Sequence, residues 1–270
     1  MIANQAARDR RNPTASAEQV MAEIRRETYG EDVGQEGWVT TSEYDLYFSS
    51  LGLPPGSEVL YVASGSGDPA CYLAGKFWCR ITGLPLEQEG AQLPGPQREG
   101  CAAPGIHLGS ARFLPAEGAS RLPFDDGSFD ALLCVDAISR MKDRGAALAE
   151  WRRVVKVGGR ILFTDPVVIT GAVTSEELAE RSSMGPCVFM PLEQTKEQIR
   201  EAGFELIRCD DMTHSLAQTS GRWQAGRAQR RDALVALEGR EQFERLQRFG
   251  AAVSQLAAEG RLSRFAFLAE

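Results

Sequence analysis

Residues 58 to 67 read Glu-Val-Leu-Tyr-Val-Ala-Ser-Gly-Ser-Gly, and Asp68-Pro69 follows directly. The apolar half predicts a buried β-strand, while Gly65 and Gly67 predict a tight turn into a helix that begins near Asp68. Glycine is needed at such a turn because a side chain would hold the backbone away from a ligand. The stretch is typical of the place where an α/β sheet receives a nucleotide-like ligand on a helix N-terminus.

Bulk composition limits the class of protein. A chain of 270 residues is long enough for one large α/β domain with additional helical elements. The net charge of −7, with no block dense in Lys or Arg, favours a small-molecule substrate over a nucleic-acid partner. No apolar run approaches the roughly 18 to 20 residues that span a bilayer, and the N-terminus lacks a signal peptide's apolar core. We therefore expect no membrane partner and a cytoplasmic location, whereas the oligomeric state stays open.

The cysteines show no motif. No Cys-x-x-Cys pair occurs, so neither zinc-ligand spacing nor a disulfide framework is visible, and we expect reduced thiols and no metal site. Two of them fall in or beside predicted strands, where cysteine behaves as a small hydrophobic residue. The six positions are Cys71, Cys79, Cys101, Cys134, Cys187 and Cys209.

Strands and helices are expected to alternate along the chain, which predicts a mostly parallel sheet covered on both faces with a reversed last strand. The Pro/Gly-rich residues 85–110 hold four prolines and five glycines, so a loop is expected there instead of a helix. The expected strands are 58–63, 78–84, 111–114, 131–135, 159–164, 204–209 and 264–269. The expected helices are 17–29, 42–51, 68–76, 144–156, 192–202, 217–238 and 241–258.

Two further segments carry a family resemblance. Residues 122–130 read Leu-Pro-Phe-Asp-Asp-Gly-Ser-Phe-Asp, and residues 150–163 read Glu-Trp-Arg-Arg-Val-Val-Lys-Val-Gly-Gly-Arg-Ile-Leu-Phe. Together with residues 58–67, they resemble the class I S-adenosylmethionine (SAM) dependent methyltransferases over about residues 36 to 270. The resemblance implies an α/β, Rossmann-like, doubly wound, seven-stranded and mostly parallel sheet with helical lid elements, and it implies SAM as the cofactor.

The resemblance also implies a division of the chain. Residues 1–35 would form an N-terminal extension or lid helix, and residues 36–270 the methyltransferase-like domain. Residues 217–258 would be a helical lid insertion before the last strand. In similar enzymes these helices help to wall the acceptor pocket, where Met184 and Phe189 would give an apolar lining.

The cofactor loop of the family is only partly matched. An acidic residue normally precedes Gly-x-Gly-x-Gly and holds the methionine end of SAM, but Tyr61 stands at the acidic position here. We expect its phenol to fill the lost volume or to contact the substrate. The loop residues that the resemblance assigns to cofactor binding are Ala63, Ser64, Gly65, Ser66 and Gly67.

Two other acidic positions of the family are also replaced. The acid that accepts hydrogen bonds from both ribose hydroxyls would stand at Pro85. Glu87 and Glu89 lie near enough in sequence to substitute for it. The acid that receives the adenine amino group aligns with Gly118, and Glu117 stands one place earlier.

The N-terminal segment and the end of strand four supply further candidates. Trp38 and Thr41 resemble the family segment that folds over the cofactor, and the indole would either cover the adenosine or staple a helix onto the domain. Asp136 is a candidate for positioning the substrate, with helix capping as the other interpretation. Arg140 stands where the family often has His, and a guanidinium cannot act as a base near neutral pH.

Of the two histidines, His214 is the candidate general base. It follows strand six at the carboxyl edge of the sheet, where ligands bind in open α/β folds, and an imidazole suits proton abstraction near neutral pH. A surface position without a catalytic role is the competing interpretation. His107 lies in the Pro/Gly-rich segment, where we expect it to be solvated.

Two classes of function follow. The first is methyl transfer from SAM to an oxygen, nitrogen or carbon of a small metabolite in a biosynthetic pathway, where positioning dominates and a strong base is dispensable. The second is a methyltransferase fold that has lost or repurposed SAM, either as a cyclase or isomerase or as a non-catalytic partner protein. In either case we expect the principal pocket at the carboxyl edge of the sheet.

Overall fold

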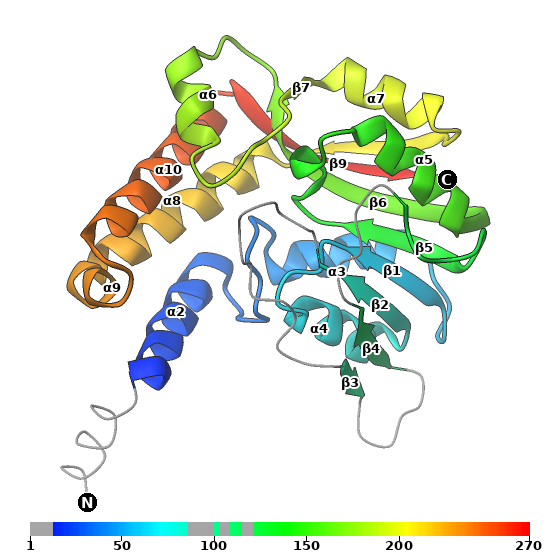
Figure 1. Cartoon of the computed structure of the whole chain (residues 1–270), viewed down its shortest axis with the longest axis horizontal. Helices are drawn as coiled ribbons and strands as arrows, with labels where there is room; N and C mark the ends of the chain where they lie inside the picture. Colours follow the sequence, from blue (N-terminus) through cyan, green and yellow to red (C-terminus); the bar gives the residue numbers. More distant parts are fainter. Residues whose placement is uncertain (1–12, 86–99, 103–108, 115–120) are drawn as a thin grey trace, which may run out of the picture.

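The computed structural model describes residues 13–85, 100–102, 109–114 and 121–270. Within them a central sheet is flanked by helices, and a separate helical layer stands beside it (Figure 1). The expected positions Glu87, Glu89, His107 and Glu117 lie outside the described residues.

The strands form one sheet with a central parallel region. Their bounds are β1 (Glu58–Val62), β2 (Arg80–Leu84), β3 (Gly100–Ala102), β4 (Ser110–Phe113), β5 (Phe129–Cys134), β6 (Val155–Ile169), β7 (Met190–Pro191), β8 (Leu206–Asp211) and β9 (Leu262–Ala269). The order is β3-β4-β2-β1-β5-β6-β9-β8, and β7 pairs with β6. β1 runs parallel to both β2 and β5, whereas β9 runs antiparallel between β6 and β8. Apart from the short β3 and β7, this confirms the expected seven-stranded, doubly wound sheet with a reversed last strand.

The helices fall into two groups. Their bounds are α2 (Pro13–Tyr29), α3 (Thr41–Ser50), α4 (Asp68–Phe77), the 3₁₀ helix η1 (Ile138–Arg140), α5 (Arg144–Val154), α6 (Ser175–Arg181), α7 (Leu192–Glu201), α8 (Thr213–Gln229), α9 (Arg231–Glu238) and α10 (Arg240–Ala258). In Figure 1, α2, α8, α9 and α10 form the layer beside the sheet, with α6 at its upper end. Within the described ranges, no helix has the length and apolar character needed to cross a bilayer.

Both faces of the sheet carry a hydrophobic core, because successive side chains of a strand point to opposite faces. Leu60 of β1 joins the core beneath α5 and α7, together with Trp151 and Phe163. Val59 and Tyr61 join the other core beneath α3 and α4. Burial on both faces explains why β1 reads as an apolar run rather than as an alternating pattern.

Two of the differences from the sequence expectation concern the start of α8 and the Pro/Gly-rich segment. α8 begins at Thr213 rather than at 217, so His214 lies in the first turn of a helix and not in a loop. The preceding Met212 provides no side-chain cap, which left this start without a sequence signal. β3 is an antiparallel partner of β4 inside the Pro/Gly-rich segment, where only a loop was expected.

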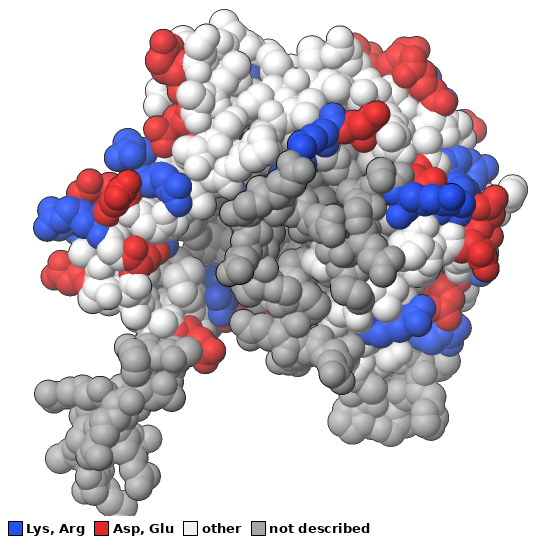
Figure 2. Space-filling model, viewed as in Figure 1, with Lys and Arg blue, Asp and Glu red and all other residues white. Residues whose placement is uncertain are grey.

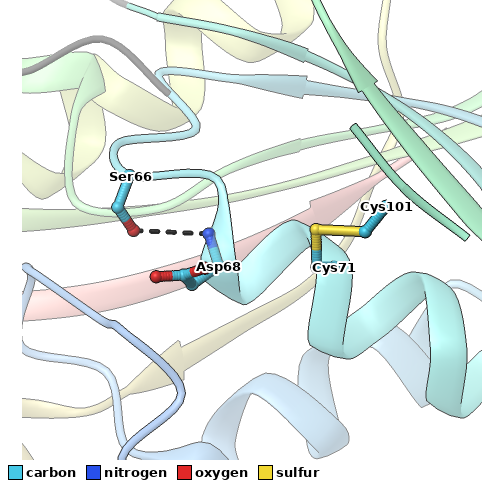
Figure 3. The surroundings of a disulfide bond; sticks show 4 residues. All are labelled: Ser66, Asp68, Cys71 and Cys101. Carbon is cyan, nitrogen blue, oxygen red and sulfur yellow. Dashed lines mark hydrogen bonds between the residues drawn. A yellow bond between two sulfur atoms is a disulfide. The ribbon is translucent and has the colours of Figure 1, made fainter. Parts of the chain in front are cut away.

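Cys71 of α4 and Cys101 of β3 form a disulfide (Figure 3). The expectation that all cysteines are reduced was therefore wrong for this pair. The two residues are 30 positions apart and become neighbours only because β3 pairs with β4 next to α4. No short motif encodes that pairing. Cys79 and Cys134 are free and buried, as expected for small hydrophobic residues.

Candidate functional site

The site is organised by the turn between β1 and α4. The backbone φ is positive at Ala63 (58°), Gly65 (56°) and Gly67 (85°). A positive φ is uncommon for alanine, and residues in such conformations cluster at functional sites. The Ser64 N–H donates to the carbonyl of Leu84 at 2.9 Å, and the Gly67 N–H donates to the carbonyl of Ser64 at 3.1 Å. These bonds fix the turn at the carboxyl ends of β1 and β2.

Glu36 and Phe113 close over this turn. A Cβ atom added at Gly65 would lie 3.2 Å from Glu36 Oε2, and one at Gly67 would lie 2.6 Å from the ring of Phe113. The hydroxyl of Ser64 is buried and has no hydrogen-bond partner among the described residues. Glycine is therefore required at both positions, since a Cβ would meet Glu36 or Phe113, and the unpaired Ser64 hydroxyl is one buried polar atom that a bound ligand would satisfy.

The far side of the turn is fastened through Ser66. Its hydroxyl donates to the carbonyl of Gly34 at 3.1 Å and accepts from the Asp68 N–H at 3.3 Å (Figure 3). The loop before α3 is thereby attached to the start of α4. Ser66 thus has a clear structural role beside the cofactor role that the sequence assigns to it.

Glu36 is a residue that sequence reasoning missed. Its side chain is exposed to solvent, yet enough protein surrounds its carboxyl group to raise its pKa by desolvation. Arg25 and Arg140 oppose this shift, while Asp68 adds to it. Glu36 therefore lies against the turn while part of its side chain stays open to solvent. Nothing in the local sequence marks Glu36, because its approach to Gly65 depends on the fold.

Tyr61 fills the position of the family acid. Its hydroxyl oxygen lies 2.9 Å from that of Tyr44, and both side chains are buried. Burial raises the pKa of both phenols, so both stay protonated and one donates to the other. The Tyr61 phenol therefore occupies volume beneath the turn and presents no negative charge there.

Asp136, two residues after β5, accepts two hydrogen bonds and forms an ion pair. Its carboxylate accepts from the Trp38 N–H at 2.8 Å and from the Thr164 hydroxyl at 2.6 Å, and it lies 3.1 Å from Arg264 Nε. Its φ of 51° is also positive. The residue before η1 is Ala137, so Asp136 does not cap that helix. Asp136 holds the N-terminal segment at the carboxyl edge of the sheet.

Arg264 of β9 completes this buried network. Its guanidinium donates to the carbonyl of Trp38 at 3.0 Å and to the hydroxyl of Tyr47 at 3.3 Å, and it lies 3.4 Å from Glu43 Oε1. Glu43 also closes the capping box of α3 with Thr40. Sequence reasoning missed Arg264, although an arginine inside an otherwise apolar strand is a detectable signal.

Trp38 and Thr41 serve packing in this structure. The Trp38 ring lies 6.0 Å from that of Trp223 and is stacked 6.2 Å from that of Phe249, so it fastens the N-terminal segment to α8 and α10. This arrangement favours the staple interpretation of Trp38. Thr41 is buried, and its hydroxyl donates to the carbonyl of Glu31 at 3.3 Å.

His214 and Arg140 have contrasting surroundings. His214 is exposed on the first turn of α8, with Nε2 3.0 Å from Gln218 Nε2. Among the described residues, no hydrogen bond or ion pair joins it to Asp136 or Arg140, which favours the surface interpretation. Arg140 is partly buried at the end of η1 and lies within electrostatic reach of both Glu36 and Arg181. Arg140 therefore lies near the turn through Glu36, whereas His214 does not.

Charge around the site is mixed. Figure 2 shows basic and acidic side chains interspersed over the face drawn, with no patch of one sign among the residues described. Such a surface does not provide the clustered cations that phosphate backbones require.

Comparisons with known proteins agree with this geometry. Residues 60–163 match the family model described as a methyltransferase domain. The chain is 30% identical over 200 residues to a sarcosine/dimethylglycine N-methyltransferase of Halorhodospira halochloris, which covers 72% of this chain and 68% of the relative. It is 26% identical over 168 residues to an O-methyltransferase of Pyrenophora dematioidea, covering 62% of this chain and 61% of that relative's length. The crystal structure of the [4+2]-cyclase SpnF shares the fold, with a TM-score of 0.68, 21% identity and coverage of 93% of both chains.

Proposed function

Because this chain belongs to the class I S-adenosylmethionine-dependent methyltransferases, we propose that it transfers the methyl group of SAM, the cofactor of that family, to an atom of a small, partly apolar metabolite. The family resemblance found in the sequence is confirmed. Its relatives are named for transfer to nitrogen and to oxygen, which supports these two elements as acceptor atoms. A place in a biosynthetic pathway is part of the same proposal.

The observation that carries the proposal is the strained turn from Ala63 to Gly67, with Glu36 and Phe113 over it. The matched region, residues 60–163, includes this turn. SAM supplies an electrophilic methyl group together with an ammonium, a carboxylate and an adenosine. The backbone of the turn would hold the cofactor closely, and Glu36 would accept from its ammonium group in place of the acid missing at Tyr61.

The chain's own residues would act mainly by positioning. Asp136 and Arg264 hold the segment that carries Glu36 and Trp38, and the Trp38 cluster fastens it to the helical layer. A fixed in-line approach of the acceptor needs no strong base, which agrees with the exposed and separate place of His214. The same clusters would exclude water from the reacting groups.

Calorimetry with SAM and S-adenosylhomocysteine (SAH) tests the proposal on a matched pair of variants. Gly65→Ala and Gly260→Ala both place alanine at a positive φ, of 56° and 64°, and so share the backbone strain. Only the Cβ at Gly65 would meet a neighbour, Glu36, whereas nothing lies within 4 Å at Gly260. We expect Gly65→Ala to weaken SAH binding by about tenfold or more, and Gly260→Ala to bind like the wild type.

A third variant examines Glu36 itself. Glu36→Gln removes the charge and keeps the size, so loss of one charge-assisted bond should weaken SAH binding by about tenfold. An equal effect of Gly65→Ala and Gly260→Ala would contradict the role of the turn. A wild-type protein that binds neither SAM nor SAH at millimolar concentration would reject methyl transfer.

One observation favours a second candidate. The Tyr61–Tyr44 pair occupies the position of the cofactor-binding acid, and a [4+2]-cyclase has the same fold. A cofactor-independent cyclase or isomerase is therefore the alternative, and absence of SAM binding combined with folded protein would favour it. The cytoplasmic location remains a prediction. The Cys71–Cys101 disulfide counts against it, since such bonds are rare in reducing compartments.

A further inference from the structure

Arg181, the last residue of α6, is buried in the region above the carboxyl edge of the sheet. Only 6% of its surface is exposed. Its guanidinium carbon lies 5.1 Å from the centre of the Phe249 ring of α10. The segment that follows α6 is fastened to η1, because the Val188 N–H donates to the carbonyl of Ser139 at 2.6 Å. Arg181 therefore lies between the helical layer and the end of β5.

Arg181 differs from the other buried arginines in its partners. Arg144 lies 2.8 Å from Asp165, Arg264 lies 3.1 Å from Asp136, and Arg227 pairs with Glu238. Among the residues that the structure describes, no carboxylate forms an ion pair with Arg181. A buried charge without a counter-charge is strongly unfavourable, so such groups are normally paired. Within the described ranges the four buried arginines are Arg144, Arg181, Arg227 and Arg264.

The nearby acids are already engaged. Asp136 and Asp165 are within electrostatic reach of Arg181, but Asp136 accepts from Trp38 and Thr164 and is paired with Arg264, and Asp165 is paired with Arg144. Cys187 is also near, and a thiol is only a weak acceptor.

The remaining neighbours do not neutralise the guanidinium. Burial is the largest effect on the pKa of Arg181 and lowers it; Arg140 lowers it further, whereas Cys187, Asp136 and Asp165 act in the opposite direction. The Phe249 ring face attracts a cation but supplies no hydrogen-bond acceptor and no counter-charge. Arg181 and Arg140 thus approach the same region, and although Glu36 lies near Arg140, no described carboxylate forms an ion pair with Arg181.

We propose that Arg181, flanked by Arg140, forms an anion-binding subsite of the acceptor pocket and takes a carboxylate or phosphate group of the methyl acceptor. The guanidinium fork matches both groups in a bidentate manner. Phe249 provides an apolar surface beside Arg181, and Trp38 and Trp223 continue the aromatic cluster behind it, which suits an acceptor with one anionic end and a partly apolar body. This inference rests on the proposed methyltransferase function, because it names the substrate class of that site.

The first test compares the stabilities of two buried-arginine variants without ligand. Arg181→Met removes a charge that has no protein partner, so we expect its Tm to exceed that of the wild type by about 2 to 8 °C. Arg144→Met leaves Asp165 buried without a counter-charge, so its Tm should fall. An Arg181→Met protein destabilised as much as Arg144→Met would show that Arg181 has a structural partner, and it would overturn the proposal.

The second test measures binding of inorganic phosphate and of acetate at constant ionic strength, with chloride as the control anion. Trp38 and Trp223 lie next to Phe249, so intrinsic fluorescence reports on the subsite. The wild type should show a saturable change with phosphate, with acetate or with both, which identifies the group. Arg181→Met should weaken this binding by about tenfold or more. The affinity of Arg181→Lys should lie between those of the wild type and Arg181→Met, because lysine keeps the charge but cannot bind the anion in a bidentate manner. No saturable effect in the wild type, or the same effect in Arg181→Met, would overturn the proposal.

The two tests stay separate from the cofactor question. The anion titrations are done without cofactor, whereas SAH binding is measured by calorimetry on the same proteins. Arg181→Met should bind SAH within about twofold of the wild type, since the subsite serves the acceptor. If SAH binding falls as far as anion binding, Arg181 belongs to the cofactor site and the proposal is wrong. If the wild type binds anions but not SAH, the methyltransferase function fails while the anion subsite stands.

Discussion

Replacing Asp136 with Asn removes one charge from the buried network and leaves its shape unchanged. Asn adopts a positive φ readily, so the φ of 51° is retained and the charge alone is removed. The buried Arg264 then loses its partner at 3.1 Å and keeps Glu43 at 3.4 Å. Breaking a buried pair costs about 3 to 5 kcal/mol, and the remaining Glu43 places the expected loss near 3 kcal/mol. For a chain of this size, the Tm should fall by about 6 to 12 °C.

Denaturant unfolding and hydrogen exchange together measure this effect. The loss should appear in the free energy of unfolding and as faster exchange at residues 31–40, because Asp136 accepts from the Trp38 N–H. Asp45→Asn is the matched control. Asp45 pairs at the surface with Lys76 at 2.6 Å, and an exposed pair of this kind contributes about 0 to 1 kcal/mol.

A small effect of Asp136→Asn would contradict this role of the buried network. Asp136→Asn could unfold within about 1 kcal/mol of the wild type, like the surface control, with unchanged exchange at residues 31–40. In that case Arg264 would be satisfied without Asp136, and the network would not hold the N-terminal segment in place.

Three other predictions follow from the fold. Thiol titration of unreduced, denatured protein should detect four of the six cysteines, whereas a count of six would exclude the Cys71–Cys101 bond. Because the bond closes a loop of 30 residues, Cys71→Ser should lose about 3 to 4 kcal/mol of stability. The hydrogen bond from Arg261 lowers the pKa of the Glu177 carboxyl from 4.5 to about 2, so the stabilising effect of this pair should be present above pH 4.5 and lost as the pH falls towards 2. Glu177→Gln should therefore flatten the fall in Tm over this range, and an unchanged profile would contradict the pairing. Saturation with SAH should protect residues 17–48 and 170–190 from hydrogen exchange, and unchanged exchange in both would argue against a lid.

The sheet could be predicted because its signals are local. The apolar run of β1, the glycines after it and the Gly158-Gly159 pair inside β6 lie within, or about ten residues from, the elements that they define. The capping box of Thr174 and Glu177 at the start of α6 is an equally local signal. β3 and β7 span three and two residues, which is too short to show any period, so the sequence could not reveal them.

The candidate site was predicted only in part, because its charges interact over long sequence distances. The Ala63 to Gly67 turn was found from its own residues, and Tyr61 was recognised as filling an acidic position. Glu36 reaches Gly65 only through the loop before α3, and Arg264 and Glu43 are 221 positions apart. No periodicity or spacing rule extends over such distances, so neither contact could be expected from the sequence.

The buried arginines show why composition does not separate structural from functional charge. Arg264 in β9 and Arg144 in α5 have the same side chain as Arg181 and are also buried, yet each has a carboxylate within 3.1 Å. For a paired arginine, the carboxylate partner offsets the free-energy cost of desolvation, and the ion pair fixes the positions of the two elements that carry it. For Arg181 that offset must come from outside the described protein groups. The distinction depends on the partner and not on the arginine, and therefore becomes visible only once the fold has placed Asp136 and Asp165 against their own arginines.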